Sequence, residues 1–86
     1  MSHVFGYTIA NDVSGRDWQK KRNGGQWLLG KTFDSFCPLG PVVDTSLDPS
    51  NLTIKSWIND DLMQDSNTKH LVFDIPVRLK QVSIFV

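Results

Sequence analysis

Eighty-six residues, 40% of them hydrophobic, make one small domain at most and exclude an intrinsically disordered chain. Nine basic and nine acidic residues cancel, and all nine acids are aspartate, so no net charge directs the chain to nucleic acid or to an anionic membrane. Cys37 is the single cysteine, no signal peptide is recognisable, and no apolar run reaches the ~20 residues of a spanning helix. We therefore expect a soluble protein of a reducing, intracellular compartment.

The first part of the chain predicts one strand and one short helix. Residues 4–13 alternate loosely between two faces, which favours a strand. Ser14 is the predicted N-cap of a helix over residues 15–22, because its side chain is of the type that accepts a bond from the first helical turn. The sequence Asn-Gly-Gly at residues 23–25 is a strong helix breaker. A short apolar segment follows at residues 26–29.

The middle of the chain predicts an irregular strand, a turn and a β-hairpin. Two prolines restrict residues 36–44 to an edge or irregular strand, because proline cannot donate a ladder hydrogen bond. The sequence Asp-Pro-Ser-Asn at residues 48–51 is typical of a turn. Residues 52–58 alternate as a strand, and a turn at residues 59–60 leads to a second strand at residues 62–64.

The last part of the chain predicts a loop and a helix. Residues 65–69 are polar and loop-like, and residues 71–73 form a short apolar strand or turn. Asp74 is a predicted N-cap, with Pro76 in the first helical turn, where its missing N–H costs nothing. One helical face then carries the apolar residues Ile75, Leu79, Val82 and Val86. The fold class is mixed β with short helices, an α+β arrangement.

Two residues in the first part have functional potential. Asp12 closes the predicted strand before the helix, and its carboxylate is a suitable oxygen ligand for a divalent cation such as Mg²⁺. Lys31 follows an apolar segment that can partly desolvate its ammonium. By spacing alone, Asp12 fits a capping or turn residue better, and Lys31 fits a lysine that extends past an apolar strand to water.

Other polar residues point less clearly to a site. Arg16 and Gln19 are three residues apart on the predicted helix, so they face either one ligand or solvent. The basic residues 20–22 are best interpreted as solvated surface, and Cys37 as a packing residue. Taken without reference to other proteins, these residues support no specific function.

Several segments resemble signatures of the fumarylacetoacetate hydrolase family. Residues 7–19, YTIANDVSGRDWQ, resemble its GYTxxNDVSARDxQ motif, and residues 26–41, QWLLGKTFDSFCPLGP, resemble its second signature at about the expected spacing. Further matches follow in order at residues 48–52, 67–68 and 73–76, so the resemblance covers the whole chain. It is closest to the family's domain-containing protein 2 type. It implies that residues 1–86 are part of a fumarylacetoacetase C-terminal-like β-roll, truncated at both ends.

This resemblance implies a metal-dependent enzyme that acts on small 2-oxo or β-diketo acids. The implied reactions are acylpyruvate-type C–C hydrolysis, and tautomerisation or decarboxylation of oxaloacetate. Carried over by position, Asp12 is a ligand of Mg²⁺ or Mn²⁺ with Ser35 near the same ion, and Lys31 stabilises the oxygen that becomes an enolate. Gln19 and Arg16 are implied substrate-binding residues. The family relationship further implies a homodimer in mitochondria or cytoplasm, without a nucleic-acid or membrane partner.

The sequence also departs from the family pattern. The family's Glu-x-Glu metal ligands, its His-Glu lid pair and its Gly-Thr-Pro loop have no counterpart here, and Gly15 stands where alanine is usual. One aspartate would bind Mg²⁺ very weakly, because the ion needs six oxygen ligands. We therefore expect the isolated chain to be inactive or nearly so, and whether it is an enzyme by itself stays open. The alternative is a non-catalytic truncation product that associates with a full-length homologue; an unrelated small β-rich binding module is a third hypothesis.

Overall fold

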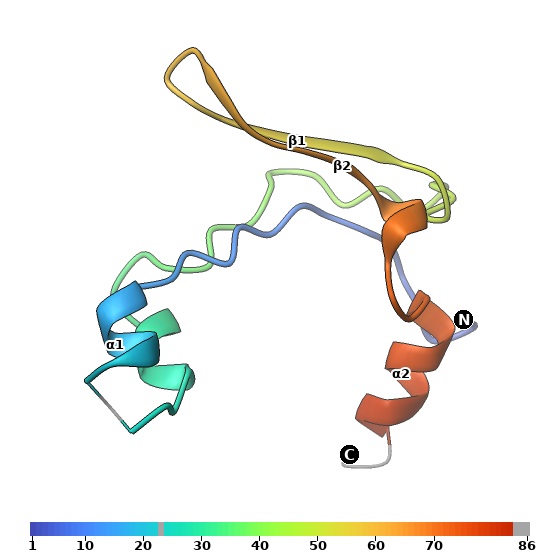
Figure 1. Ribbon diagram of the computed structural model, residues 1–86. Coiled ribbons are helices and arrows are strands. Elements are labelled where there is room, and N and C mark those ends of the chain that lie inside the picture. The colour runs from blue at the N-terminus through green and yellow to red at the C-terminus, as the bar shows by residue number, and fades with distance from the viewer. Residues whose placement is uncertain (23, 84–86) are drawn as a thin grey trace. The chain divides into compact units, whose positions relative to one another are not determined.

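The computed structural model describes residues 1–22 and 24–83 (Figure 1). The chain forms two compact units, each of which we describe by itself. The first, Gly6–Thr45, is called the loop unit here. The second combines Met1–Phe5 with the chain from Ser46 onward and is called the hairpin unit. All the site residues expected from the sequence lie in the loop unit.

The loop unit contains two short helices and two extended segments. Helix α1 covers Arg16–Lys20, and a 3₁₀ helix, η1, covers Leu28–Lys31. Between them, Gly24 and Gly25 have φ angles of 65° and 84°, a backbone conformation that favours glycine. The predicted helix over residues 15–22 is therefore shorter than expected, because α1 already ends at Lys20, and the loop after it turns at these two glycines. Asn23 lies outside the described residues.

The strand predicted at residues 4–13 is wrong in its extent. Only Tyr7 and Ala10 form β-bridges, and these pair singly with Asp44 and Leu39. In Figure 1 the two segments run beside each other within the loop unit without becoming a strand pair. The physical reason is that two prolines in residues 36–44 have no N–H to donate to a continuous ladder. The prediction of an irregular segment over residues 36–44 is therefore confirmed.

The hairpin unit is built on two antiparallel strands, as the sequence predicts. Strand β1, Thr53–Ile58, pairs with β2, Asp61–Asn67, around a tight turn in which Asn59 has a φ of 52°. Asparagine tolerates this left-handed conformation better than most residues. The register shifts between Ser56 and Trp57, because their partners Gln64 and Leu62 leave Met63 as an extra residue in β2.

The second strand is longer than the sequence predicts. Residues 65–67, which read as a loop, continue β2, and the 3₁₀ helix η2, Thr68–His70, follows directly. Asp65 stands opposite Lys55, so unlike charges face each other across the pair, and Asn67 stands opposite Thr53. Cross-strand pairing thus overrides the low strand propensity of these polar residues.

The helix predicted near the end of the chain is confirmed. Helix α2 covers Ile75–Ser83, and the Asp74 carboxylate accepts a hydrogen bond from the Val77 N–H at 3.1 Å. Asp74 thus satisfies one of the N–H groups that a helix start leaves unpaired. The described part of its predicted apolar face is exposed at Leu79 and Val82, while Val86 lies outside the described residues.

The described residues bury no apolar side chain. Large hydrophobic side chains are exposed in both units, for example Phe5 at 82%, Ile9 at 69% and Val72 at 85%. Gln19 is the one buried polar side chain among them, at 2% exposure. Burial of apolar surface is the main term that stabilises a fold, and the described chain gains this term only from partly covered side chains. No helix within residues 1–22 and 24–83 has the length and apolar character to cross a membrane.

Candidate active site

The backbone that carries the candidate site is held by close contacts between the α1 and η1 segments. The Gly15 N–H donates to the Gly30 carbonyl at 2.7 Å, which joins the start of α1 to η1. Gln19 packs on Gly30: a Cβ on Gly30 would lie 2.8 Å from both the backbone nitrogen and the Cβ of Gln19. Only glycine fits this approach, so Gly30 fixes where the next residue, Lys31, begins its side chain.

Asp12 and Lys31 form an ion pair in the loop unit. The Lys31 ammonium donates to the Asp12 carboxylate and, at 3.1 Å, to the Ser14 hydroxyl. The Lys31 side chain is 27% exposed, while that of Asp12 is 73% exposed. The two bonds use two of the three N–H donors of the ammonium. The structure therefore brings together the two residues that the sequence singled out, with one lysine donor left for a ligand oxygen.

Ser14 has a different role from the predicted helix cap. The N-cap of α1 is Gly15, and no side chain caps this helix. The Ser14 hydroxyl instead donates to the Asp12 carbonyl at 3.2 Å and accepts from Lys31. The prediction failed because the helix begins one residue later, which turns the serine toward the loop that carries Asp12.

Arg16 and Gln19 interact with each other on α1. The Arg16 guanidinium donates to the Gln19 side-chain oxygen at 3.0 Å, across the three-residue spacing noted in the sequence. Arg16 is exposed, but the Gln19 side chain is almost completely buried against Gly30. The bond satisfies the buried amide oxygen. Substrate binding by either residue stays a prediction.

Ser35 lies in an aromatic-flanked turn beyond η1. It is exposed and has a φ of 63°, and Cys37 close by has a φ of 58°. Next to this turn, the Phe33 ring makes edge-to-face contacts with Trp18 at 6.1 Å and with Phe36 at 5.3 Å between ring centroids. Such contacts stabilise the position of Phe33. The role of Ser35 near a metal stays a prediction.

The described residues do not form a complete metal site by themselves. No group of three His, Cys or Asp side chains within the described ranges lies close enough together to hold one ion. The Asp12 carboxylate, a good oxygen ligand, is already bonded to the Lys31 ammonium, which would repel a cation. Since Mg²⁺ requires near-octahedral coordination, these residues do not form a complete magnesium site. Asp12 and Ser35 remain predicted ligands.

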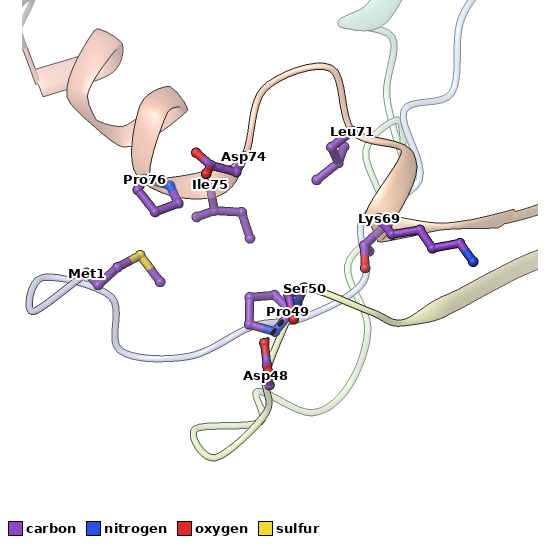
Figure 2. Close-up of a pocket in the computed structure, with 10 residues that line it drawn as sticks. Met1, Asp48, Pro49, Ser50, Lys69, Leu71, Asp74, Ile75 and Pro76 are labelled. Carbon is purple, nitrogen blue, oxygen red and sulfur yellow. Dashed lines mark hydrogen bonds between the residues drawn. The ribbon is translucent and has the colours of Figure 1, made fainter.

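A separate cavity of about 350 Å³ lies in the hairpin unit, between the 48–50 turn and the start of α2 (Figure 2). Ile75 points into it, whereas the Lys69 ammonium points away (Figure 2). The backbone N–H of Ser50 donates to Asp48 at 2.9 Å, and hydrogen bonds from Ser50 hold the pKa of that carboxyl below its usual value. None of the predicted site residues lines this cavity, so it is distinct from the Asp12–Lys31 pair.

The family to which the chain belongs follows from a comparison with protein-family models. The model of the fumarylacetoacetate hydrolase C-terminal domain matches residues 1–86. The chain belongs to the fumarylacetoacetate hydrolase family. The predicted membership is thereby confirmed, and so is the α+β fold class, because structures of similar proteins superpose on this chain.

Three similar proteins illustrate the relationship. The chain is 56% identical over 89 residues to the mitochondrial oxaloacetate tautomerase fahd2 of Xenopus laevis. This alignment covers 100% of this chain and 28% of the relative. The structure of a 5-carboxymethyl-2-hydroxymuconate delta-isomerase from Mycobacterium smegmatis is 46% identical, with a TM-score of 0.87 over 92% of this chain and 31% of that protein. The structure of a 2-hydroxyhepta-2,4-diene-1,7-dioate isomerase from Mycobacterium marinum is 38% identical. Its TM-score is 0.90, over 95% of this chain and 32% of that protein. The chain thus spans about a third or less of each.

Sequence reasoning missed two residues of the site, Ser14 and Gly30. Ser14 was assigned to a helix start, and the signal for its actual role was its place two residues after Asp12, a spacing at which a serine hydroxyl can bond a loop carbonyl. Gly30 was not singled out. Its close approach to Gln19 depends on packing between segments, which spacing along the chain does not reveal.

Proposed function

We propose that this chain supplies part of an active site that acts on small 2-oxo acids through an enolate, with Lys31 as the catalytic residue. The observation that carries the proposal is the geometry of the Lys31 ammonium. Asp12 and Ser14 each accept one of its N–H bonds, so the cation is held in place with one donor left over. A fixed cation is the type of group that stabilises negative charge as it develops on an oxygen.

Enol–keto tautomerisation of oxaloacetate is the reaction we favour. It moves one proton between the carbon and the oxygen of a carbonyl system, and negative charge collects on that oxygen when the carbon has lost its proton. The remaining Lys31 donor would bond this oxygen and lower the barrier. The relative from Xenopus laevis supports this choice, because it is named an oxaloacetate tautomerase. Acylpyruvate-type C–C hydrolysis is the other reaction that the same stabilisation would serve.

The remaining predicted residues have supporting roles in this proposal. Arg16, exposed on α1, would bind a substrate carboxylate. Gln19 would reach the substrate only after its amide leaves Arg16, so we assign it a part in binding and not in chemistry. Asp12 and Ser35 would contribute oxygen atoms to a metal whose other ligands come from outside the described residues.

The proposal is tested in a chimera in which residues 1–86 replace the matching segment of the Xenopus laevis tautomerase. Turnover of oxaloacetate enol is followed by its ultraviolet absorbance. Lys31→Ala is expected to lower kcat by roughly 10²–10³, the loss typical of removing one donor to a developing oxyanion. Lys55→Ala, at an exposed position of β1, is the matched control and should leave kcat unchanged. Equal turnover of Lys31→Ala and the unmodified chimera would refute the proposal.

We also propose the cellular setting that the family relationship suggests. The relative from Xenopus laevis is named as mitochondrial, and we propose the same compartment, a homodimer and a requirement for Mg²⁺ or Mn²⁺. Removing divalent ions from the chimera with a chelator should abolish turnover, and adding back Mg²⁺ should restore it. Full activity in excess chelator would contradict the metal requirement.

The isolated 86-residue chain is expected to have little or no activity. At the candidate site, its described residues offer the ion-paired carboxylate of Asp12 in place of the several oxygen ligands that Mg²⁺ needs. Isothermal titration of the chain with Mg²⁺ and oxalate should therefore show no binding in the micromolar range. Micromolar affinity for the pair would mean that the chain forms a complete site.

A second candidate function is non-catalytic association with a full-length homologue. It is favoured by the exposed apolar side chains, because no apolar side chain of the described residues is fully buried and exposed apolar surfaces mark interaction sites. The chain should co-elute with the full-length Xenopus laevis relative in size-exclusion chromatography, and should self-associate at high concentration when alone. A compact monomer that unfolds cooperatively would contradict this function.

A further inference from the structure

We infer that Ser14 is a positioning residue of this site: its hydroxyl orients the Lys31 ammonium so that the remaining N–H donor faces the substrate. The inference rests on the proposed function of Lys31 and adds a residue to which no role in the reaction was assigned. Ser14 itself need not touch the substrate. It acts through Lys31, and three observations in the loop unit support this role.

The first observation is the direction of the hydrogen bonds at the Ser14 hydroxyl. This group has a single hydrogen, and it donates that hydrogen to the Asp12 carbonyl at 3.2 Å. Its oxygen therefore uses a lone pair to accept the hydrogen bond from the Lys31 ammonium, at 3.1 Å. The hydroxyl oxygen is thus a fixed acceptor, and the group that faces it must be a hydrogen-bond donor such as the Lys31 ammonium.

The second observation is the exposure of the other partner of Lys31. The Asp12 side chain is 73% exposed, and ion pairs at such positions hold weakly because water screens them. Ser14 is half-buried, and its bond to the cation is less accessible to water. With Asp12 alone, the ammonium would rotate and sample several orientations. Two acceptors in different directions restrict it to one.

The third observation is the backbone that sets the distance between Ser14 and Lys31. Their chain neighbours, Gly15 and Gly30, are joined by the 2.7 Å hydrogen bond from N–H to carbonyl. Packing of Gly30 on Gln19 holds the same junction. The two side chains therefore start from adjacent, fixed points. The short reach of a serine hydroxyl suits this spacing.

The test compares Ser14→Ala and Ser14→Thr in the chimera with the unmodified chimera. Ser14→Ala should lower kcat about tenfold with little change in KM, because a bond to the charged ammonium is lost and the substrate contacts stay. Ser14→Thr keeps the hydroxyl and should recover most of the rate. Ser83→Ala is the control, since this exposed serine on α2 also donates to a backbone carbonyl, that of Lys80. It should have no effect on kcat.

The outcomes separate this inference from the proposed function. Equal kcat for Ser14→Ala and the unmodified chimera, with Lys31→Ala inactive, would overturn the role of Ser14 and leave that of Lys31 intact. Equal losses in Ser14→Ala and Ser14→Thr would also overturn it, because the hydroxyl would then be irrelevant. Full turnover by Lys31→Ala would overturn the proposed function itself, and the inference with it.

Discussion

Substitution of Gly30 by alanine should disturb the contact on which the whole site rests. The added Cβ would lie 2.8 Å from the Gln19 nitrogen and 2.9 Å from its Cα, whereas ordinary contacts begin at 3.4 Å. The α1 backbone and η1 must therefore separate by roughly 0.6 Å, and backbone atoms cannot rotate away as the end of a side chain can. Overpacking of this kind costs about 1–3 kcal/mol, and the lower entropy of the unfolded alanine chain offsets about 0.4–1 kcal/mol of it.

The net expectation for Gly30→Ala is a loss of roughly 1–2 kcal/mol in the free energy of unfolding. Because Lys31 follows directly, its ammonium moves relative to Asp12, and a displacement of about 1 Å at a reacting group can cost about a hundredfold in rate. The chimera is the protein to use, with Tm measured by differential scanning calorimetry and kcat by enol absorbance. We expect a Tm lower by a few degrees and a kcat at least about tenfold lower.

Gly15→Ala provides the matched control for this prediction. Gly15 has a φ of −76°, which alanine adopts freely, and its added Cβ would meet the edge of the Phe33 ring at 3.2 Å. A ring can shift by a few tenths of an ångström, so this variant should be close to neutral, in line with the alanine of the family motif. If Gly30→Ala and Gly15→Ala had the same Tm and kcat, the argument from close packing at Gly30 would be refuted.

Two further predictions concern the hairpin unit. Asp74→Ala removes the acceptor for the Val77 N–H at the start of α2 and should destabilise that helix by about 1 kcal/mol. The amide hydrogens of α2 should then exchange roughly fivefold faster. Unchanged exchange would rule out a capping role. Hydrogen bonds from the backbone and side chain of Ser50 hold the pKa of Asp48 below 3.8, so the folded unit binds fewer protons than the unfolded chain in acid. This turn should stabilise the unit above pH 3.8 and lose its contribution as pH falls through the lowered pKa of Asp48. An NMR titration of Asp48 measures that pKa, and Asp48→Asn should remove this pH dependence of stability. A pKa at or above 3.8 would contradict the prediction.

Local features of this chain could be predicted from the sequence wherever one residue type decides the backbone. Gly24 and Gly25 take positive φ angles in the loop after α1, Asn59 allows a tight hairpin turn, and Asp74 caps α2, as expected. Each rule depends on a few neighbouring atoms, so the rest of the fold does not alter it. The sequence suggested Asp12 and Lys31 as separate candidate residues. Their pairing could not be predicted, because the contact joins positions that are nineteen residues apart.

Features that depend on contacts between segments could not be predicted in this way. Ser14 fits a helix-cap pattern, yet it bonds Asp12 and Lys31 because α1 begins at the next residue. The strand over residues 65–67 forms because a partner strand is present, which local propensity does not record. The apolar faces at Leu79 and Val82 satisfied the periodicity of a buried helix, but periodicity does not tell whether anything covers the face.

The central claim is that Asp12 and Lys31 act as one unit in an enolate-forming site. A double-mutant cycle in the chimera, with Asp12→Asn, Lys31→Ala and both together, tests it most directly through kcat for oxaloacetate enol. Asp12→Asn keeps one side-chain oxygen for a metal but loses the charge that pairs with Lys31. Residues that act as a unit are strongly non-additive, so the double variant should be no slower than Lys31→Ala alone, within about twofold. Losses that multiply, with the double variant slower by the product of the two single effects, would show that the two residues act independently and would contradict the claim.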